Sequence, residues 1–285
     1  MARAARVPNG EGLLWRVEKP GVPASHLFGT MQATDARAVA LPAPVRAALA
    51  EARAVVREVS ESDDPDQADA AARRLVSAAA VPSGDGLAFL TDALARHAVE
   101  AAVVDCGMPP EAAHYFSPWF LYVMLSVPNC EFVRQQAGFA TLDQVIVAAR
   151  PRAAKLAGLE SPDEQIAAMT ALNDAAKPSL VAAARLKARR ADLFATLVDS
   201  YVQRRVSALR EVLRESGLYA ADELKALDAV VDRMVVRRND RLAARARPFL
   251  EAGNAFVAVG ALHLAGGNGL VAQFRQAGYS VTRVW

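Results

Sequence analysis

The position of the strand-like segments near the two ends of the chain constrains the fold most. Residues 255–260 form a short apolar run that ends at a glycine, which is typical of a buried strand. Residues 279–284 predict the last strand. Near the other end, residues 13–18 and 25–30 flank a Pro-Gly turn and predict a hairpin, and residues 54–59 predict a third strand. Because strands need hydrogen-bonding partners, we expect both ends to share one sheet.

The long middle of the chain favours helices. From about residue 62 to residue 235 the only strand-like segment is short, at 153–158. We expect one helix over 87–98 and a pair of helices over 222–252. The predicted fold class is therefore α/β, with a mixed central sheet built from strands at both termini and a large helical insert packed around it. We expect one domain over residues 1–285.

Composition excludes several classes of function. The chain has 285 residues, 53% of them hydrophobic, and a formal net charge of +2, which indicates a globular protein without a basic surface for nucleic acid. The longest apolar run, residues 119–127, is far shorter than the roughly 20 residues of a membrane span. No signal-peptide core follows Met1, so we expect the cytoplasm, or the periplasm or cell envelope if the chain was trimmed. Cys106 and Cys130 show no metal or redox spacing, so two thiols and one disulfide both remain open.

Four polar residues are candidates for a functional site. Gln32 and His263 each lie three positions after a glycine at a predicted strand end, Glu58 lies near the end of the third strand, and Arg238 lies in the helix before the last strands. Open α/β sheets bind ligands beyond the carboxyl ends of their strands. A carboxylate, a guanidinium and an imidazole together would suit metal-assisted or general-base hydrolysis. The structural alternatives are a histidine satisfied in a loop, a glutamate in a surface ion pair and an arginine on a helix surface.

The same residues lie in segments that resemble the TraB/GumN family. The resemblance is carried by Leu27–Thr30 and Val56–Val59 near the N-terminus, and by Arg238–Asn239 and Phe256–Gly266 near the C-terminus. It covers nearly the whole chain in the same order. The wider superfamily includes the TIKI metalloproteases, the erythromycin esterases and ChaN-like haem-binding proteins.

The resemblance implies an active site made of two Gly-x-x-His motifs, one glutamate and one arginine. The second motif matches His263, the glutamate matches Glu58 and the arginine matches Arg238, whereas Gln32 stands where the first motif has histidine. It also implies a divalent ion such as Mn, Co or Zn, with His263 and Glu58 as the metal ligands. Because an amide oxygen is a weak ligand for a transition metal and glutamine has no basic site, we expect this ion to bind weakly or not at all.

The function predicted first is a TIKI-like metal-dependent hydrolase of peptidase type with an altered first motif. The alternative is a non-catalytic ligand-binding member of the family, a pseudoenzyme. In both cases the partner is a peptide or small molecule in a pocket, and Gln32 favours the second case. We further expect Glu58 to lie in that pocket within hydrogen-bond or one-water reach of Arg238, because a guanidinium keeps a nearby carboxylate charged.

Overall fold

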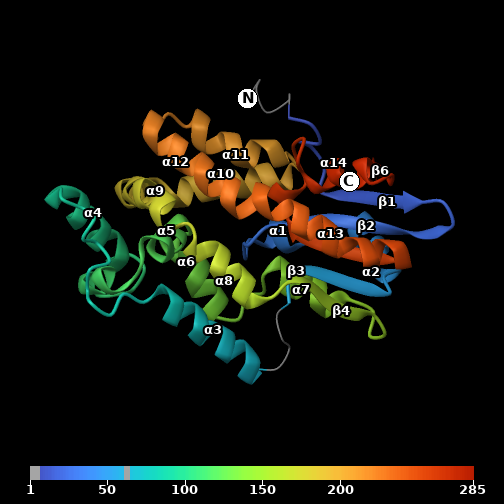
Figure 1. Ribbon diagram of the computed structural model, residues 1–285, viewed down its shortest axis with the longest axis horizontal. Coiled ribbons are helices and arrows are strands. Elements are labelled where there is room, and N and C mark those ends of the chain that lie inside the picture. The colour runs from blue at the N-terminus through green and yellow to red at the C-terminus, as the bar shows by residue number, and fades with distance from the viewer. Residues whose placement is uncertain (1–6, 61–64) are drawn as a thin grey trace.

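The computed structural model describes residues 7–60 and 65–285, and its centre is a six-stranded mixed sheet (Figure 1). The strand order is β4-β3-β5-β2-β1-β6. The strands are β1 (Leu14–Lys19), β2 (Val22–Thr30), β3 (Ala54–Val59), β4 (Lys155–Glu160), β5 (Ala255–Gly260) and β6 (Ser280–Arg283). Strands β2, β5, β3 and β4 are parallel, and β1 is antiparallel to both of its neighbours. The prediction of one sheet built from both ends of the chain is confirmed, since β2 pairs directly with β5.

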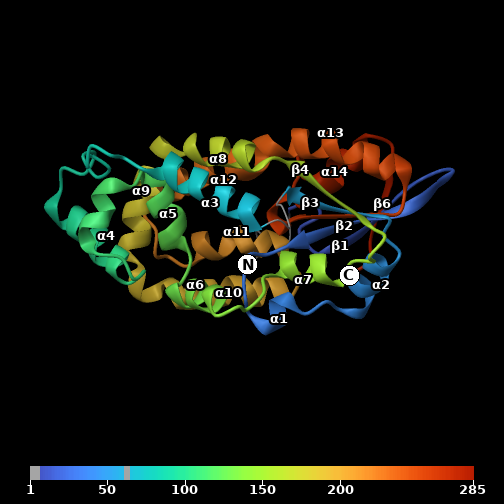
Figure 2. The ribbon, with the colours of Figure 1, turned by 90° about the horizontal axis from the view of Figure 1, so that it is seen from below.

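Helices cover both faces of the sheet, which Figure 2 shows edge-on. One face packs against α1 (Ala36–Val39), α2 (Ala43–Ala50), α7 (Leu142–Ala149) and α10 (Arg190–Val202), and the other against α13 (Arg237–Ala252) and α14 (Leu270–Gln276). Alternate strand residues point to opposite faces. Phe28 and Phe256 therefore pack on the first face, and their neighbours Leu27 and Val257 on the second. The predicted α/β class is confirmed.

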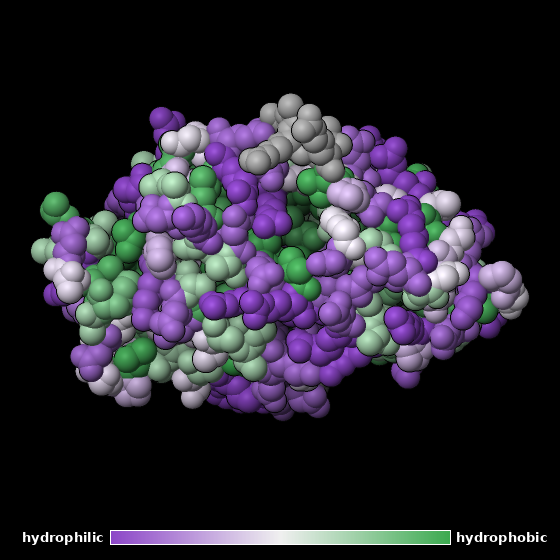
Figure 3. All heavy atoms as spheres, turned by 45° about the horizontal axis from the view of Figure 1, so that its top comes forward, coloured by the Kyte–Doolittle hydropathy of each residue, from purple (hydrophilic) through white to green (hydrophobic). Residues whose placement is uncertain are grey.

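The remaining helices form a lobe at one end of the sheet (Figure 1). They are α3 (Pro65–Ala79), α4 (Ala93–Val104), α5 (Pro118–Ser126), α6 (Asn129–Gln136), α8 (Pro162–Thr170), α9 (Asn173–Arg185), α11 (Val206–Glu215) and α12 (Ala221–Val231). Trp119, Leu121 and Leu180 are fully buried in the cores of this lobe. In the view of Figure 3, polar residues cover most of the surface and apolar residues form the floor of a hollow near the middle. Within the described residues, no helix has the length and apolar character that crossing a bilayer takes.

The short strand expected at 153–158 is confirmed as β4, which lies two positions later, at 155–160, and extends the sheet beside β3. Two expectations need correction. The helix expected over 87–98 begins only at Ala93, where the Asp92 side chain caps the amide of Leu94, and it runs to Val104. The helix pair expected over 222–252 is one continuous helix, in which a π-helical turn at Asp232–Val236 joins α12 to α13.

Candidate functional site

The carboxyl ends of the parallel strands meet at one edge of the sheet, where ligands of open α/β sheets bind. In this register Thr30 at the end of β2 pairs with Gly260 at the end of β5, and Glu58 lies beside them near the end of β3. Two cavities open there. One, of about 340 Å³, is called the apolar cavity because Met31, Leu197, Leu209, Met234, Val235 and Leu262 line most of it. Glu58, Arg238 and His263 line the same cavity.

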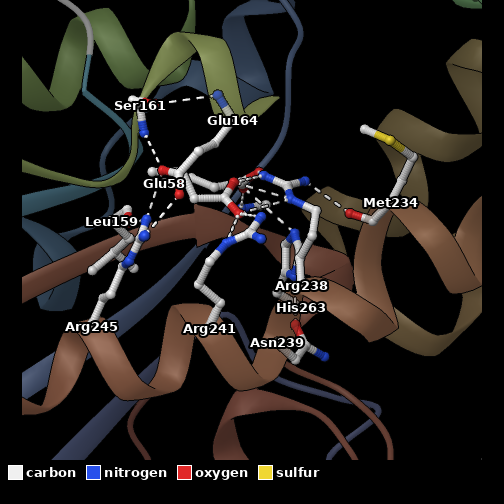
Figure 4. Close-up of polar contacts among 12 residues, drawn as sticks. Glu58, Leu159, Ser161, Glu164, Met234, Arg238, Asn239, Arg241, Arg245 and His263 are labelled. Atoms are coloured by element: carbon white, nitrogen blue, oxygen red, sulfur yellow. Dashed lines mark hydrogen bonds and ion pairs between the residues drawn. The ribbon is translucent and has the colours of Figure 1, made fainter. Parts of the chain in front are cut away.

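Arg238 joins the site to the sheet through two carboxylates (Figure 4). Its side chain is 5% exposed, and its Nη2 donates to Oε1 of Glu58 at 2.6 Å. Its Nε donates to Oε2 of Glu160 at 3.1 Å, and its Nη1 donates to the carbonyl of Met234, in the π-helical turn, at 2.8 Å. The expected contact between Glu58 and Arg238 is confirmed, and Arg238 is not a helix-surface arginine.

Glu160, at the end of β4, is a part of this network that was not among the expected site residues. Its side chain is fully buried, and it also accepts from Nε of Arg241 at 2.9 Å. Arg245, one turn further along α13, pairs with both carboxylate oxygens of Glu164 at 2.7 Å (Figure 4). Acids on β3, β4 and α8 thus alternate with arginines on α13, which fixes the helix against the strand ends.

His263 has a fixed orientation because Asn239 holds one of its ring nitrogens. The Asn239 Nδ2 donates to the carbonyl of Asn268 at 2.9 Å, so its Oδ1 is the atom that faces Nδ1 of His263, at 2.6 Å. The Nδ1–H of His263 therefore donates, and Nε2 is left facing Oε2 of Glu58 at 3.6 Å. The histidine is buried at 3% exposure and belongs to the site.

The carboxylate of Glu58 is held in its charged form. Burial alone would raise its pKa, but the interaction with His263, the charge of Arg238 and the amide of Gly260 outweigh burial, so the pKa of the carboxyl lies well below its ordinary value of 4.5. The Gly260 amide donates to Oε2 at 2.8 Å. A Cβ at position 260 would lie 3.3 Å from that oxygen, so glycine lets the strand end approach the carboxylate.

Gln32 lines a cavity that Glu58 also lines, but not the one that His263 lines. Its side chain is exposed, and its Nε2 donates to Oδ2 of Asp143 at 2.9 Å. Gln32 and Asp143 line a second cavity of about 140 Å³, here called the polar cavity, together with Thr30, Glu58 and Gly260. Glu58 lines both cavities, whereas His263 lines only the apolar one. The structure thus brings Glu58, Arg238 and His263 into direct contact and places Gln32 in the adjoining cavity.

These residues do not form a good transition-metal site. A catalytic zinc-type site has three protein ligands, and across residues 7–60 and 65–285 no group of three or more histidine, cysteine or acidic side chains could hold an ion. The Mn, Co or Zn ion implied by the resemblance remains a prediction.

Sequence comparison assigns the chain to a family. No curated protein and no solved structure matches it. The family model described as the TraB/PrgY/gumN family matches residues 13–283, which include all six strands and every residue of the site. The chain therefore belongs to the TraB/PrgY/gumN family.

Proposed function

We propose that this protein is a non-catalytic binding member of its family, whose pocket takes a protonated amine attached to a small apolar group. The observation that carries the proposal is the pair of carboxylate side chains, Glu58 and Asp143, that line one small polar cavity together with a single guanidinium, that of Arg57. Glu58 also faces the adjoining apolar cavity. A cationic group next to an apolar group would meet matching surfaces in both cavities.

Glu58 keeps acceptor capacity for such a ligand. Arg238 donates to Oε1 and the Gly260 amide donates to Oε2, so each carboxylate oxygen retains a lone pair. The side chain is 21% exposed, and that exposed part belongs to the two cavities. An ammonium bound there gains a charge-assisted hydrogen bond in a partly desolvated setting.

The apolar cavity sets the size of the ligand. At about 340 Å³ it lies near the lower end of the volumes of small-molecule sites, roughly 300–1,000 Å³. One aromatic ring or a branched aliphatic side chain fits among Met31, Leu197 and Met234. The N-terminal residue of a short peptide carries the same combination of amine and apolar group.

Calorimetric titration with phenethylamine and with phenethyl alcohol tests the proposal. Wild type should bind the amine and not the alcohol, and Glu58→Gln should lose at least about tenfold in affinity, because it removes the charge. Glu164→Gln is the matched control, since Glu164 belongs to the same row of acids but lines neither cavity. Equal binding of amine and alcohol, or unchanged binding by Glu58→Gln, would contradict the proposal.

The alternative is the metal-dependent hydrolase that the family resemblance implies. It is favoured by the 3.6 Å separation of His263 Nε2 and Glu58 Oε2, which leaves both atoms facing the same space. The deciding change is Gln32→His, which would supply the third ligand, with Asp143 beside it to orient the ring. On the binding proposal, wild type binds Mn, Co and Zn weakly and Gln32→His gains about tenfold or more. Tight metal binding by wild type, accompanied by peptide hydrolysis, would favour the hydrolase.

A further inference from the structure

A cavity in the helical lobe, distinct from the apolar and polar cavities, is lined by a buried cation without a counter-ion among the described residues. It has a volume of about 120 Å³ and lies among α5, α9, α10, α11 and α12. Six leucines line it, among them Leu125, Leu186 and Leu193. Leu197 lines both this cavity and the apolar cavity beside Glu58.

The cation is Arg190, at the start of α10. It is 8% exposed, and its Nη1 donates to Sγ of Cys106 at 3.5 Å, which is a weak acceptor. Its Nε and Nη2 are buried and have no hydrogen-bond partner. No carboxylate among the described residues lies within 4.0 Å of it, unlike Arg238, which contacts two. A buried charge is normally paired and hydrogen-bonded, so this guanidinium lacks an anion.

Other polar groups on the wall of the same cavity are suited to an anion. Ser179 is 4% exposed, and its Oγ has no hydrogen-bond partner. Tyr122 also lines the cavity, and burial raises its pKa to about 12, so its hydroxyl keeps its proton. The one acid on the wall, Glu223, is occupied by Arg185 at 2.7 Å and by the amide of Ala220 at 2.8 Å.

We propose that Arg190 binds the carboxylate of a short-chain monocarboxylic acid, whose apolar tail packs against the surrounding leucines. The planar guanidinium matches a carboxylate in a two-point interaction. A phosphate would bring a charge of about −1.5 to −2 against a single cation, whereas a carboxylate brings one. The small volume and leucine-rich wall suit a tail of a few carbon atoms.

Butyrate is the test ligand, added to the full-length protein and followed by thermal unfolding and by calorimetry. Butyrate should raise the melting temperature of wild type, whereas butanol, chloride and phosphate should not. Arg190→Met should lose at least about tenfold in butyrate affinity and should melt higher than wild type without ligand, because it removes an unpaired buried charge. Arg189→Met is the matched control, because the neighbouring Arg189 is exposed and pairs with Asp192. The butyrate affinity of this variant should equal that of wild type.

A second variant covers the case in which Arg190→Met does not fold. Ala183 also lines the cavity, so Ala183→Leu should exclude the tail and reduce butyrate binding while it leaves Arg190 in place. The proposal is overturned if wild type does not bind butyrate. It is also overturned if chloride gives the same stabilisation as butyrate, or if Arg190→Met and Ala183→Leu both bind as wild type does.

Discussion

Arg238 is the residue on which the geometry of the site depends most. It lies between Glu58 and Glu160 with 5% of its side chain exposed. Removing one partner from a buried ion network leaves uncompensated charge, which costs about 3–5 kcal/mol. We therefore expect Arg238→Met to lower the free energy of unfolding by that amount in urea denaturation.

Arg245→Met is the control for that measurement, because Arg245 lies on the same helix but its side chain is 43% exposed. An exposed ion pair contributes about 1 kcal/mol or less. If both variants lost the same free energy, Arg238 would be one more surface arginine and the network would have no special role.

Glu58 also gives the protein a defined pH dependence. Its pKa is lower in the folded protein than its ordinary value of 4.5, so its interactions stabilise the fold above that pH. This contribution is lost as the pH falls below 4.5 towards the folded-state pKa. As the pH falls below 4.5, the free energy of unfolding of wild type should therefore decrease more steeply than that of Glu58→Gln. Denaturant titrations at several pH values can measure this difference. Parallel curves would show that Glu58 has no depressed pKa.

The sequence identified the acid, the arginine and the histidine of the site but not their supporting residues. Glu58, Arg238 and His263 could be found because they lie in recognisable segments near strand ends. Glu160 and Asn239 could not be assigned roles, because these depend on how α13 packs across β4 and against the turn at Asn268. Such contacts between distant segments leave no periodic signal in the chain.

Among the elements, strand β4 brings Glu160 to the site. The lack of a side chain at Gly158 allows β4 to pair closely with β3. A Cβ at position 158 would lie 2.2 Å from the amide nitrogen of Ser60. We expect Gly158→Ala to shift the two strands and to cost about 1–3 kcal/mol in free energy of unfolding.

Gly267→Ala is the matched control for the β4 prediction, since a Cβ there would have no heavy atom within 4 Å. It should unfold like wild type in the same urea titration. Equal stability of Gly158→Ala and wild type would mean that the edge strand tolerates displacement and does not fix Glu160.

Two elements near the site, the π-helical turn and β4, were only partly predicted from the sequence. The π-helical turn at Asp232–Val236 puts the carbonyl of Met234 in reach of Arg238, and π-helical turns often occur at functional sites. The sequence predicted two helices over residues 222–252, whereas this turn joins α12 and α13 into one. The strand β4 was only weakly indicated because alanine and glycine stand at its centre, where strands favour β-branched and aromatic residues.

At the scale of the whole molecule, strands from the two ends of the chain share one sheet. Strand β5 lies between β2 and β3, and its residues Phe256 to Val259 are fully buried. We expect the amide protons of β2 and β5 to exchange with solvent together and only through global unfolding. Those of α4, at the far end of the helical lobe, should exchange sooner, as hydrogen-exchange mass spectrometry can show. Faster exchange in β5 than in α4 would contradict this order.

We propose that Glu58 anchors a protonated amine at the junction of the polar and apolar cavities. A crystal structure with bound phenethylamine tests it most directly. We expect the amine nitrogen to lie within hydrogen-bond distance, about 3 Å, of a Glu58 carboxylate oxygen, with the ring among Met31, Leu197 and Met234. A divalent ion held between Glu58 and His263, or an amine bound away from Glu58, would contradict it.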